Sequence, residues 1–169
     1  KYDEYKFYSG GKMALGRFYK FGYLSTNLEF GTFLDLGKTN QTATSLQLIY
    51  FTNLQEYGKW KFRHFIKPQL IVGNNRLNSN YDRLTLNEGQ NGIEGFSSTT
   101  LFGTKKLLMT IQSQGYSPWR FLGFRLNPYM SYTGGMLGHE NSGFSNSKLY
   151  SKISMGLIIS NDFLVFSSF

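Results

Sequence analysis

The residues best placed to do chemistry in this sequence are cations that recur at every second position of one segment. Lys59, Lys61 and Arg63 alternate with apolar residues, and Lys67 continues in the same phase. In a β-strand, positions two apart lie on one face, so these side chains form a basic row, and we expect Arg125 of a later segment to face the same way. Such a row suits a water-filled passage, either as its solvated lining or as an anion-selective filter.

Metal and hydrolytic chemistry are not predicted. His64 lies among apolar residues and His139 in a loop segment, and no Asp, Glu or Cys stands at ligand spacing around either. The chain has no Cys, which excludes thiolate metal sites and a disulfide framework. It also has no Gly-x-Ser-x-Gly segment to position a nucleophilic serine. We therefore expect no catalytic residue, no metal ligand and no cofactor, and predict that this chain is not an enzyme.

The elements that must position the cations follow from an alternation of apolar and polar residues. In residues 149–159 the odd positions are mostly apolar, and in residues 60–72 the even positions are apolar. No apolar run is long enough for a membrane helix, while 12 Tyr and 16 Phe can supply interfacial girdles. The pattern is typical of a transmembrane β-barrel, so the predicted fold class is all-β, an antiparallel up-and-down transmembrane barrel.

Composition narrows the partners. The 169 residues suit a single domain, 1–169, and show no internal repeat or domain boundary. The net charge of +8 is spread over the predicted strands instead of gathered in one run, so nucleic acid is not an expected partner. Outer-membrane lipid and lipopolysaccharide are expected instead. The chain begins at Lys1 without an initiator Met or a signal peptide, which is expected of a processed or truncated chain.

The expected meander has about eight or nine strands. The least regular stretch, residues 2–20, is expected to turn at Gly10-Gly11 between two strands, and a further turn is expected over residues 37–41. Clearer strands are expected over residues 23–34, 44–54, 59–73, 105–116, 122–136 and 149–159, and from residue 163 onward. Residues 74–102 form a long irregular loop rich in Asn, Ser and Gly, and loops of this length are usually functional or disordered.

Within this loop, Gly92-Ile93-Glu94-Gly95-Phe96 resembles the loop motif of the BamA/TamA-type superfamily of outer-membrane assembly and translocation barrels. That motif is an apolar residue, Arg, Gly and an aromatic. Residues 103–107, 128–138 and 160–166 resemble, in order, the strand after this loop, a family strand carrying Asp and Gly, and the turn into the penultimate strand. The matching strand positions here are Pro128, Ser131, Thr133 and Gly135. The resemblance implies the C-terminal half of a barrel of about sixteen strands, and a fragment that does not close by itself.

Two departures from the family pattern fall together. Glu94 stands where the loop Arg is expected, and Thr133 where the strand Asp is expected. The resemblance implies a loop folded into the lumen, where a carboxylate needs a cationic partner. We therefore expect Glu94 to contact an inward-facing cation, Arg125 or Arg63. The alternative is that residues 92–96 are an ordinary glycine turn.

By resemblance, the expected function is insertion or translocation of polypeptides at the outer membrane of a Gram-negative bacterium. The partners would be client outer-membrane proteins or other assembly subunits, and an exposed strand edge would template a client strand by β-augmentation. Two alternatives stay open. One is a passive barrel anchor for a separate periplasmic or surface domain, and the other is a small self-contained outer-membrane barrel or pore, for which Phe169 would be the terminal aromatic.

Overall fold

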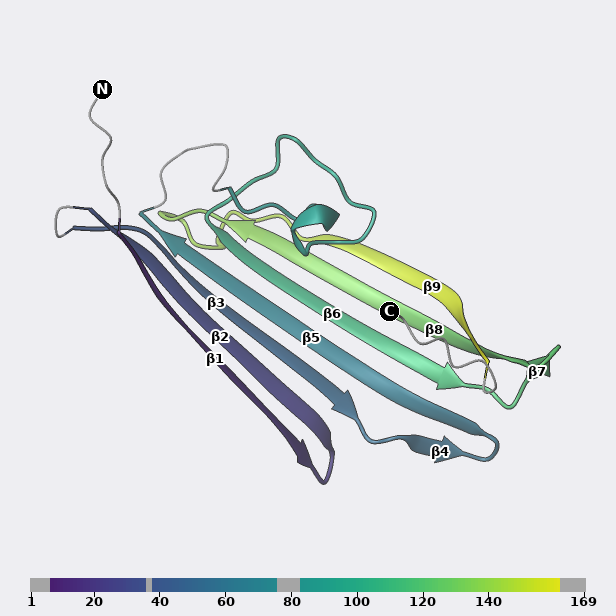
Figure 1. Ribbon diagram of the computed structural model, residues 1–169. Helices are drawn as coiled ribbons and strands as arrows, with labels where there is room; N and C mark the ends of the chain where they lie inside the picture. The colour runs from purple at the N-terminus through teal and green to yellow at the C-terminus, as the bar shows by residue number, and fades with distance from the viewer. Residues whose placement is uncertain (1–6, 36–37, 76–82, 162–169) are drawn as a thin grey trace.

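The computed structural model describes residues 7–35, 38–75 and 83–161. They form one antiparallel sheet in a single layer (Figure 1). Its strands are β1 (Phe7–Tyr19), β2 (Gly22–Asp35), β3 (Lys38–Thr52), β4 (Gln55–Tyr57), β5 (Trp60–Asn74), β6 (Lys105–Tyr116), β7 (Arg120–Phe121), β8 (Phe124–Gly138) and β9 (Tyr150–Asn161). One short 3₁₀ turn, η1 (Glu88–Gln90), lies in the loop between β5 and β6. Among these residues no helix is long and apolar enough to cross a membrane.

Neighbouring long strands in the chain are neighbours in the sheet. The order is β1-β2-β3-β5-β6-β8, with β9 paired to β8, while β4 and β7 extend short hairpins beside β5 and β8. The prediction of an all-β, antiparallel up-and-down sheet is thereby confirmed. Over the described ranges β1 and β9 are not paired with each other, so the sheet is open and closure into a barrel stays a prediction.

The two ends of the sheet differ in their connections. At one end, here called the short-turn end, the strands are joined by tight connections such as residues 20–21, 58–59 and 122–123. At the other, the long-loop end, residues 75–104 join β5 to β6 and residues 139–149 join β8 to β9. Residues 83–104 lie over one face of the sheet at this end, as Figure 1 shows. We call this face the inner face and the opposite one the outer face.

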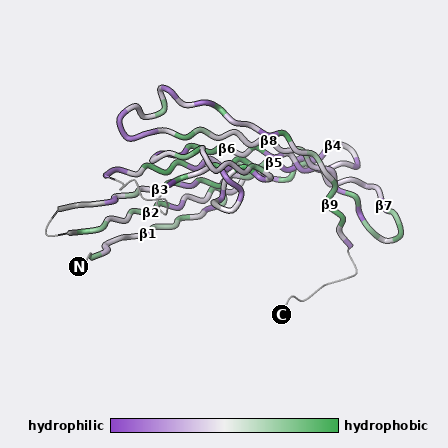
Figure 2. Tube along the Cα trace, turned by 90° about the horizontal axis from the view of Figure 1, so that it is seen from above, coloured by the Kyte–Doolittle hydropathy of each residue, from purple (hydrophilic) through white to green (hydrophobic). Residues whose placement is uncertain are grey.

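Apolar and polar side chains separate onto these two faces. In β6, the outer-face residues Leu107, Met109 and Ile111 are exposed, whereas the inner-face residues Lys106 and Leu108 are buried beneath the loop. Figure 2 shows the same alternation of hydropathy along the strands. β6 therefore directs alternate side chains to opposite faces of the sheet, as the expected period-two strand requires.

Two turns differ from the sequence prediction, and the other predicted strand bounds shift by at most two residues. The turn expected at Gly10-Gly11 is wrong, because β1 runs without interruption from Phe7 to Tyr19 and pairs along its length with β2. Hydrogen bonds to an adjacent strand keep this glycine pair extended, although glycine alone favours turns. The turn expected over residues 37–41 is also shorter than predicted, because β3 begins at Lys38. Residues 163 onward lie outside the described part.

Candidate functional site

The candidate site is the loop of residues 83–104 together with the inner-face wall beneath it. Four apolar side chains form the buried core of this contact: Leu86 and Ile93 from the loop, Leu108 from β6 and Leu137 from β8. The wall therefore offers an apolar patch within an otherwise polar face. Burial of these side chains holds the loop on the sheet.

Leu86 occupies a notch that a glycine leaves in the wall. Its side chain is 0% exposed. Gly135 lies beside Leu108 in the sheet register, and a Cβ atom at Gly135 would stand 2.8 Å from Leu86 Cδ2 and 3.0 Å from Leu108 Cδ1. Only a residue without a side chain leaves room for the leucine, since protein interiors are close-packed. Gly135 was predicted as a position of the partner strand, but nothing in the sequence identifies Leu86 as the residue that fills its notch.

Hydrogen bonds keep the loop in one shape. The amide of Ile93 donates to the Leu86 carbonyl oxygen at 2.8 Å. The side chain of Asn87 bridges to Ser98 in both directions, accepting from the Ser98 amide at 2.8 Å and donating to the Ser98 carbonyl oxygen at 3.0 Å. Leu84 and Gly103 close the base of the loop as an isolated β-bridge. The loop is thus an ordered element with its own backbone pairing.

The motif residues 92–96 form a turn at the tip of the loop. Gly95 has a φ of +69°, a conformation that favours glycine, and its amide donates to Glu88 Oε2 at 3.0 Å. The Phe96 ring meets the ring of Tyr150 on β9 edge-on, with centroids 5.6 Å apart. Within the motif, Gly92, Ile93 and Phe96 therefore contribute backbone shape and side-chain packing. The charged group of the motif is the Glu94 carboxylate.

Glu94 binds Lys152 of β9. Lys152 Nζ donates to Glu94 Oε2 at 3.2 Å and to the Glu94 carbonyl oxygen at 3.0 Å. The expected partners, Arg63 and Arg125, were wrong. Arg63 is in register with Gln114, toward the short-turn end, and Arg125 lies at the start of β8, so both are too far along the strands from the loop.

The position of Lys152 relates directly to Thr133. These two residues are cross-strand partners of β9 and β8, so their side chains share the inner face. Thr133 also lies within hydrogen-bond distance of Thr110, with their hydroxyl oxygens 3.2 Å apart. The contact between loop and wall therefore combines a loop carboxylate with a wall cation one strand away from Thr133. Lys152 was not predicted as the partner of Glu94, although its even position in the alternating strand indicates the inner face.

Lys106 is a second wall cation that sequence reasoning did not single out as a site residue. It is 2% exposed, and its Nζ donates to the Asn91 carbonyl oxygen at 3.4 Å. The loop covers its aliphatic stem, since long cationic side chains pack along apolar surface while directing the charged group to a polar partner. Two lysines thus hold the tip of the loop from two strands.

The remaining predicted wall residues lie away from this contact. Pro128 faces outward, where its ring is near the position that a Cβ at Gly115 would take, and Ser131 lies on the inner face in register with Gln112. Among the predicted basic residues, Lys67 pairs in register with Thr110, and the Arg63 guanidinium stacks 5.2 Å from the Phe51 ring centroid. The basic group of Lys59, Lys61 and Arg125 gathers at the short-turn end, around a cavity it shares with Arg120.

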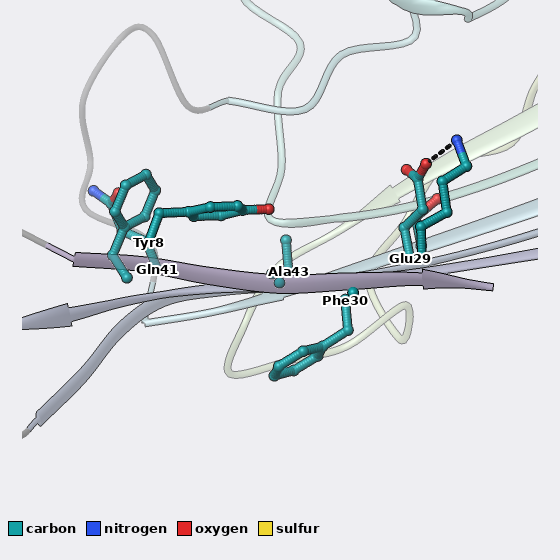
Figure 3. Close-up of a pocket in the computed structure, with 11 residues that line it drawn as sticks. Tyr8, Glu29, Phe30, Gln41 and Ala43 are labelled. Carbon is teal, nitrogen blue, oxygen red and sulfur yellow. Dashed lines mark ion pairs between the residues drawn. The ribbon is translucent and has the colours of Figure 1, made fainter.

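A second hollow lies at the other side of the inner face, near β1. Its volume is about 540 Å³, and Tyr8, Gly31 and Ala43 are among its lining residues. Figure 3 shows Tyr8, Ala43 and Glu29 on one side of the strands and Phe30 on the other. Tyr8 lies over Gly31 of the neighbouring strand, so this aromatic ring fills part of the space left by the glycine.

No group of three or more His, Cys, Asp or Glu side chains that could hold a metal occurs within residues 7–35, 38–75 and 83–161. The loop covers one end of the inner face and is held there by apolar packing and by contacts with two lysines. Comparisons with protein-family models, with curated proteins and with solved structures find no match to this chain.

Proposed function

We propose that this sheet is part of the wall of an outer-membrane β-barrel, with its outer face in lipid and the 83–104 loop in the lumen. The observation that carries the proposal is the continuous apolar outer face. Exposed outer-face residues include Leu15, Leu28, Ile111, Met130, Ile153, Met155 and Leu157. These residues come from β1, β2, β6, β8 and β9, and an exposed apolar surface spread over so many strands is far larger than the patches typical of soluble monomers.

Aromatic residues at the short-turn end support the same assignment. Trp60 and Trp119 pack edge-on with centroids 4.9 Å apart, and Tyr19 stacks on Phe21 at 5.2 Å. Arg17, on the outer face of β1, lies 5.8 Å from the centre of the Tyr19 ring. Aromatic girdles with nearby cations are typical of the level at which a membrane protein meets the lipid head groups.

The strand length also fits a bilayer. The apolar outer positions of β5 run from Phe62 to Val72, which is roughly 33 Å at 3.3 Å per residue. With a strand tilt of about 40°, this length gives an apolar band about 25 Å tall, the height usual for outer-membrane barrels. The long strands therefore have the reach that membrane-spanning strands require.

For such an outer-membrane barrel, the activity we propose is insertion or translocation of polypeptides at the outer membrane. It is supported by the resemblance of residues 92–96 to the BamA/TamA-type loop motif and by the docking of that loop on the inner face through Leu86 and Glu94. The strand edges of the sheet would offer backbone groups to a client strand. The expected partners are lipid, lipopolysaccharide and client outer-membrane proteins.

A passive membrane anchor is the second candidate, and the firmness of the loop favours it. Apolar packing of Leu86 and Ile93, the two-way Asn87–Ser98 bridge and two lysine contacts hold the loop together. A loop held by this many contacts is suited to stay in place in the lumen. The two candidates differ in whether release of the loop is part of the function.

Single-cysteine labelling in lipid vesicles tests the membrane assignment. We expect a lipophilic maleimide to label Leu107→Cys, Met109→Cys and Ile111→Cys on the outer face of β6. The neighbouring variants Thr110→Cys and Gln112→Cys should instead react with a membrane-impermeant reagent that enters through the lumen. Preferential lipophilic labelling at residues 110 and 112 would contradict the proposal, as would protection of the outer positions by a protein partner in the absence of lipid.

A reconstitution assay separates insertion from anchoring. Vesicles that contain the full-length protein should accelerate folding of an unfolded outer-membrane protein relative to empty vesicles if it is an insertase. A reducible cross-link between residues 94 and 152, made by treating the double variant Glu94→Cys/Lys152→Cys with a bis-methanethiosulfonate reagent, should abolish this acceleration, and reduction of the cross-link should restore it. Equal folding rates in all vesicles would favour the anchor.

A further inference from the structure

Four cationic side chains converge at the short-turn end of the inner face. Lys59 and Lys61 come from the hairpin of β4 and β5, and Arg120 and Arg125 from the hairpin of β7 and β8. All four line one cavity of about 300 Å³, which is at the lower end of the size range of small-ligand sites. The convergence of positive charge from two separate hairpins needs an explanation, because like charges close together destabilise a fold.

The two arginines are held directly opposite each other. Arg120 and Arg125 are cross-strand partners in the two-residue ladder of β7 with β8, so both side chains lie on one side of the hairpin. Each also interacts elsewhere in the chain. Because a guanidinium carries five N–H donors in a planar fork, both can bind an oxyanion in addition to those contacts.

The turn beneath the cavity is rigid. Ser117, which lines the cavity, is 4% exposed, as is Asn127. The Ser117 hydroxyl donates to the Leu126 carbonyl oxygen at 2.5 Å and accepts from the Trp119 amide at 3.2 Å, and the Ser117 amide donates to Asn127 Oδ1 at 3.3 Å. These bonds fix the chain just before Arg120, which preorganises the cations for a ligand.

The second hairpin is fixed to the first. Trp60, between the two lysines, packs against Trp119 with centroids 4.9 Å apart. Lys61 pairs with Glu56 at 2.6 Å, but both side chains are largely exposed, so this ion pair is weak in water. Glu56 therefore orients the Lys61 side chain.

We propose that this cavity binds a phosphate group. Two guanidiniums and two ammonium groups suit a compact anion with up to two negative charges and several acceptor oxygens, and the arginine fork can bind two of those oxygens at once. A single carboxylate would satisfy fewer of these donors. The phosphate belongs either to a lipid head group or to a water-soluble phosphate, and both present the same chemistry to the four cations. The site depends on the folded hairpins and not on the proposed insertion activity.

Calorimetric titration of the full-length protein in detergent micelles with inorganic phosphate, at low ionic strength, tests this site. We expect saturable binding that Arg120→Gln and Arg125→Gln each weaken at least tenfold. Arg17→Gln is the matched control, because Arg17 also lies near the short-turn end but shares the outer face with Leu24. Its phosphate affinity should equal that of the wild type. Absence of saturable binding, or an equal loss in Arg17→Gln, would overturn the proposal.

Further arms of the experiment identify the source of the phosphate and guard against misfolding. Tighter binding of dihexanoylphosphatidylglycerol than of inorganic phosphate assigns the site to lipid, and the reverse order assigns it to a soluble phosphate. A polyglutamate peptide that outcompetes both would refute a phosphate site. If either Gln variant fails to fold by circular dichroism, Arg120→Lys or Arg125→Lys replaces it. We then expect a smaller but measurable loss of phosphate affinity, because a lysine keeps the charge but not the planar fork. An affinity equal to that of the wild type would overturn the proposal.

Discussion

The side chain of Leu86 in the loop fills the space that Gly135 of β8 leaves by having no side chain. A Cβ atom at residue 135 would lie 2.8 Å from Leu86 Cδ2, closer than real carbon atoms approach. The leucine side chain is 0% exposed, so the sheet and the loop are complementary at this point. This contact, more than any ion pair, sets where the loop rests on the inner face.

Gly135→Ala should therefore displace the loop. The added methyl group overpacks a filled notch, and we expect it to destabilise the structure by about 1–3 kcal/mol. Because β8 is fixed by its neighbours in the sheet, the loop should move and its docking on the sheet should weaken. Hydrogen exchange at the amide of Ile93, which is bonded to the Leu86 carbonyl oxygen, should speed up. Gly134→Ala is the control, since its methyl group would meet mainly the flexible end of Tyr132. Unchanged exchange in Gly135→Ala would contradict this account.

Asn87→Ala should loosen the loop from within. It removes both hydrogen bonds to Ser98, at 2.8 and 3.0 Å, and each such bond contributes about 1 kcal/mol. Asn87→Asp is the informative partner variant, because a carboxylate still accepts from the Ser98 amide but no longer donates to its carbonyl oxygen. We expect hydrogen exchange across residues 83–104 to rise in the order wild type, Asn87→Asp, Asn87→Ala. An Asp variant as labile as the Ala variant would show that the acceptor bond contributes little.

Much of the sheet follows from the sequence because alternation is a local signal. Residues 105–116 were predicted as one strand, and β6 has those bounds. The same alternation puts Thr133 and Lys152 on one face of the sheet, where they are cross-strand partners. Local signals fail where tertiary pairing overrides them, as at Gly10-Gly11, which the register with β2 keeps extended.

The site was less predictable because it depends on which loop residue meets which strand residue. The charge of Glu94 predicted a cationic partner, but periodicity alone does not say how far along the strands the loop lies. Arg63 pairs with Gln114, which pairs with Tyr129, four positions from Thr133, or about 13 Å at 3.3 Å per residue. The notch at Gly135 left no signal at all, since nothing in the sequence connects a glycine in one strand to Leu86.

The Glu94–Lys152 ion pair should contribute little by itself. The Glu94 side chain is 72% exposed and that of Lys152 36% exposed, and exposed pairs are typically worth about 0.2–1 kcal/mol. Glu94→Gln should therefore change loop protection only slightly. Glu94→Lys places a like charge beside Lys152 and should loosen the tip, and Lys152→Glu in the same chain should restore it. A coupling energy well above about 1 kcal/mol in this double-mutant cycle would show that the pair is shielded from water.

Ser117→Ala should destabilise the turn between β6 and β7. The substitution leaves the Leu126 carbonyl oxygen and the Trp119 amide without the hydroxyl that joins them, and Ser117 is 4% exposed, so water replaces these bonds poorly. We expect a loss of about 1–3 kcal/mol in the free energy of unfolding, measured as a lower urea midpoint in lipid vesicles. Ser145→Ala is the matched control, because Ser145 is an exposed loop residue and the same atoms are removed. If the two variants unfold at the same urea concentration, the hydroxyl of Ser117 does not hold the turn, and the rigidity we attribute to the base of the cationic cavity is lost with it.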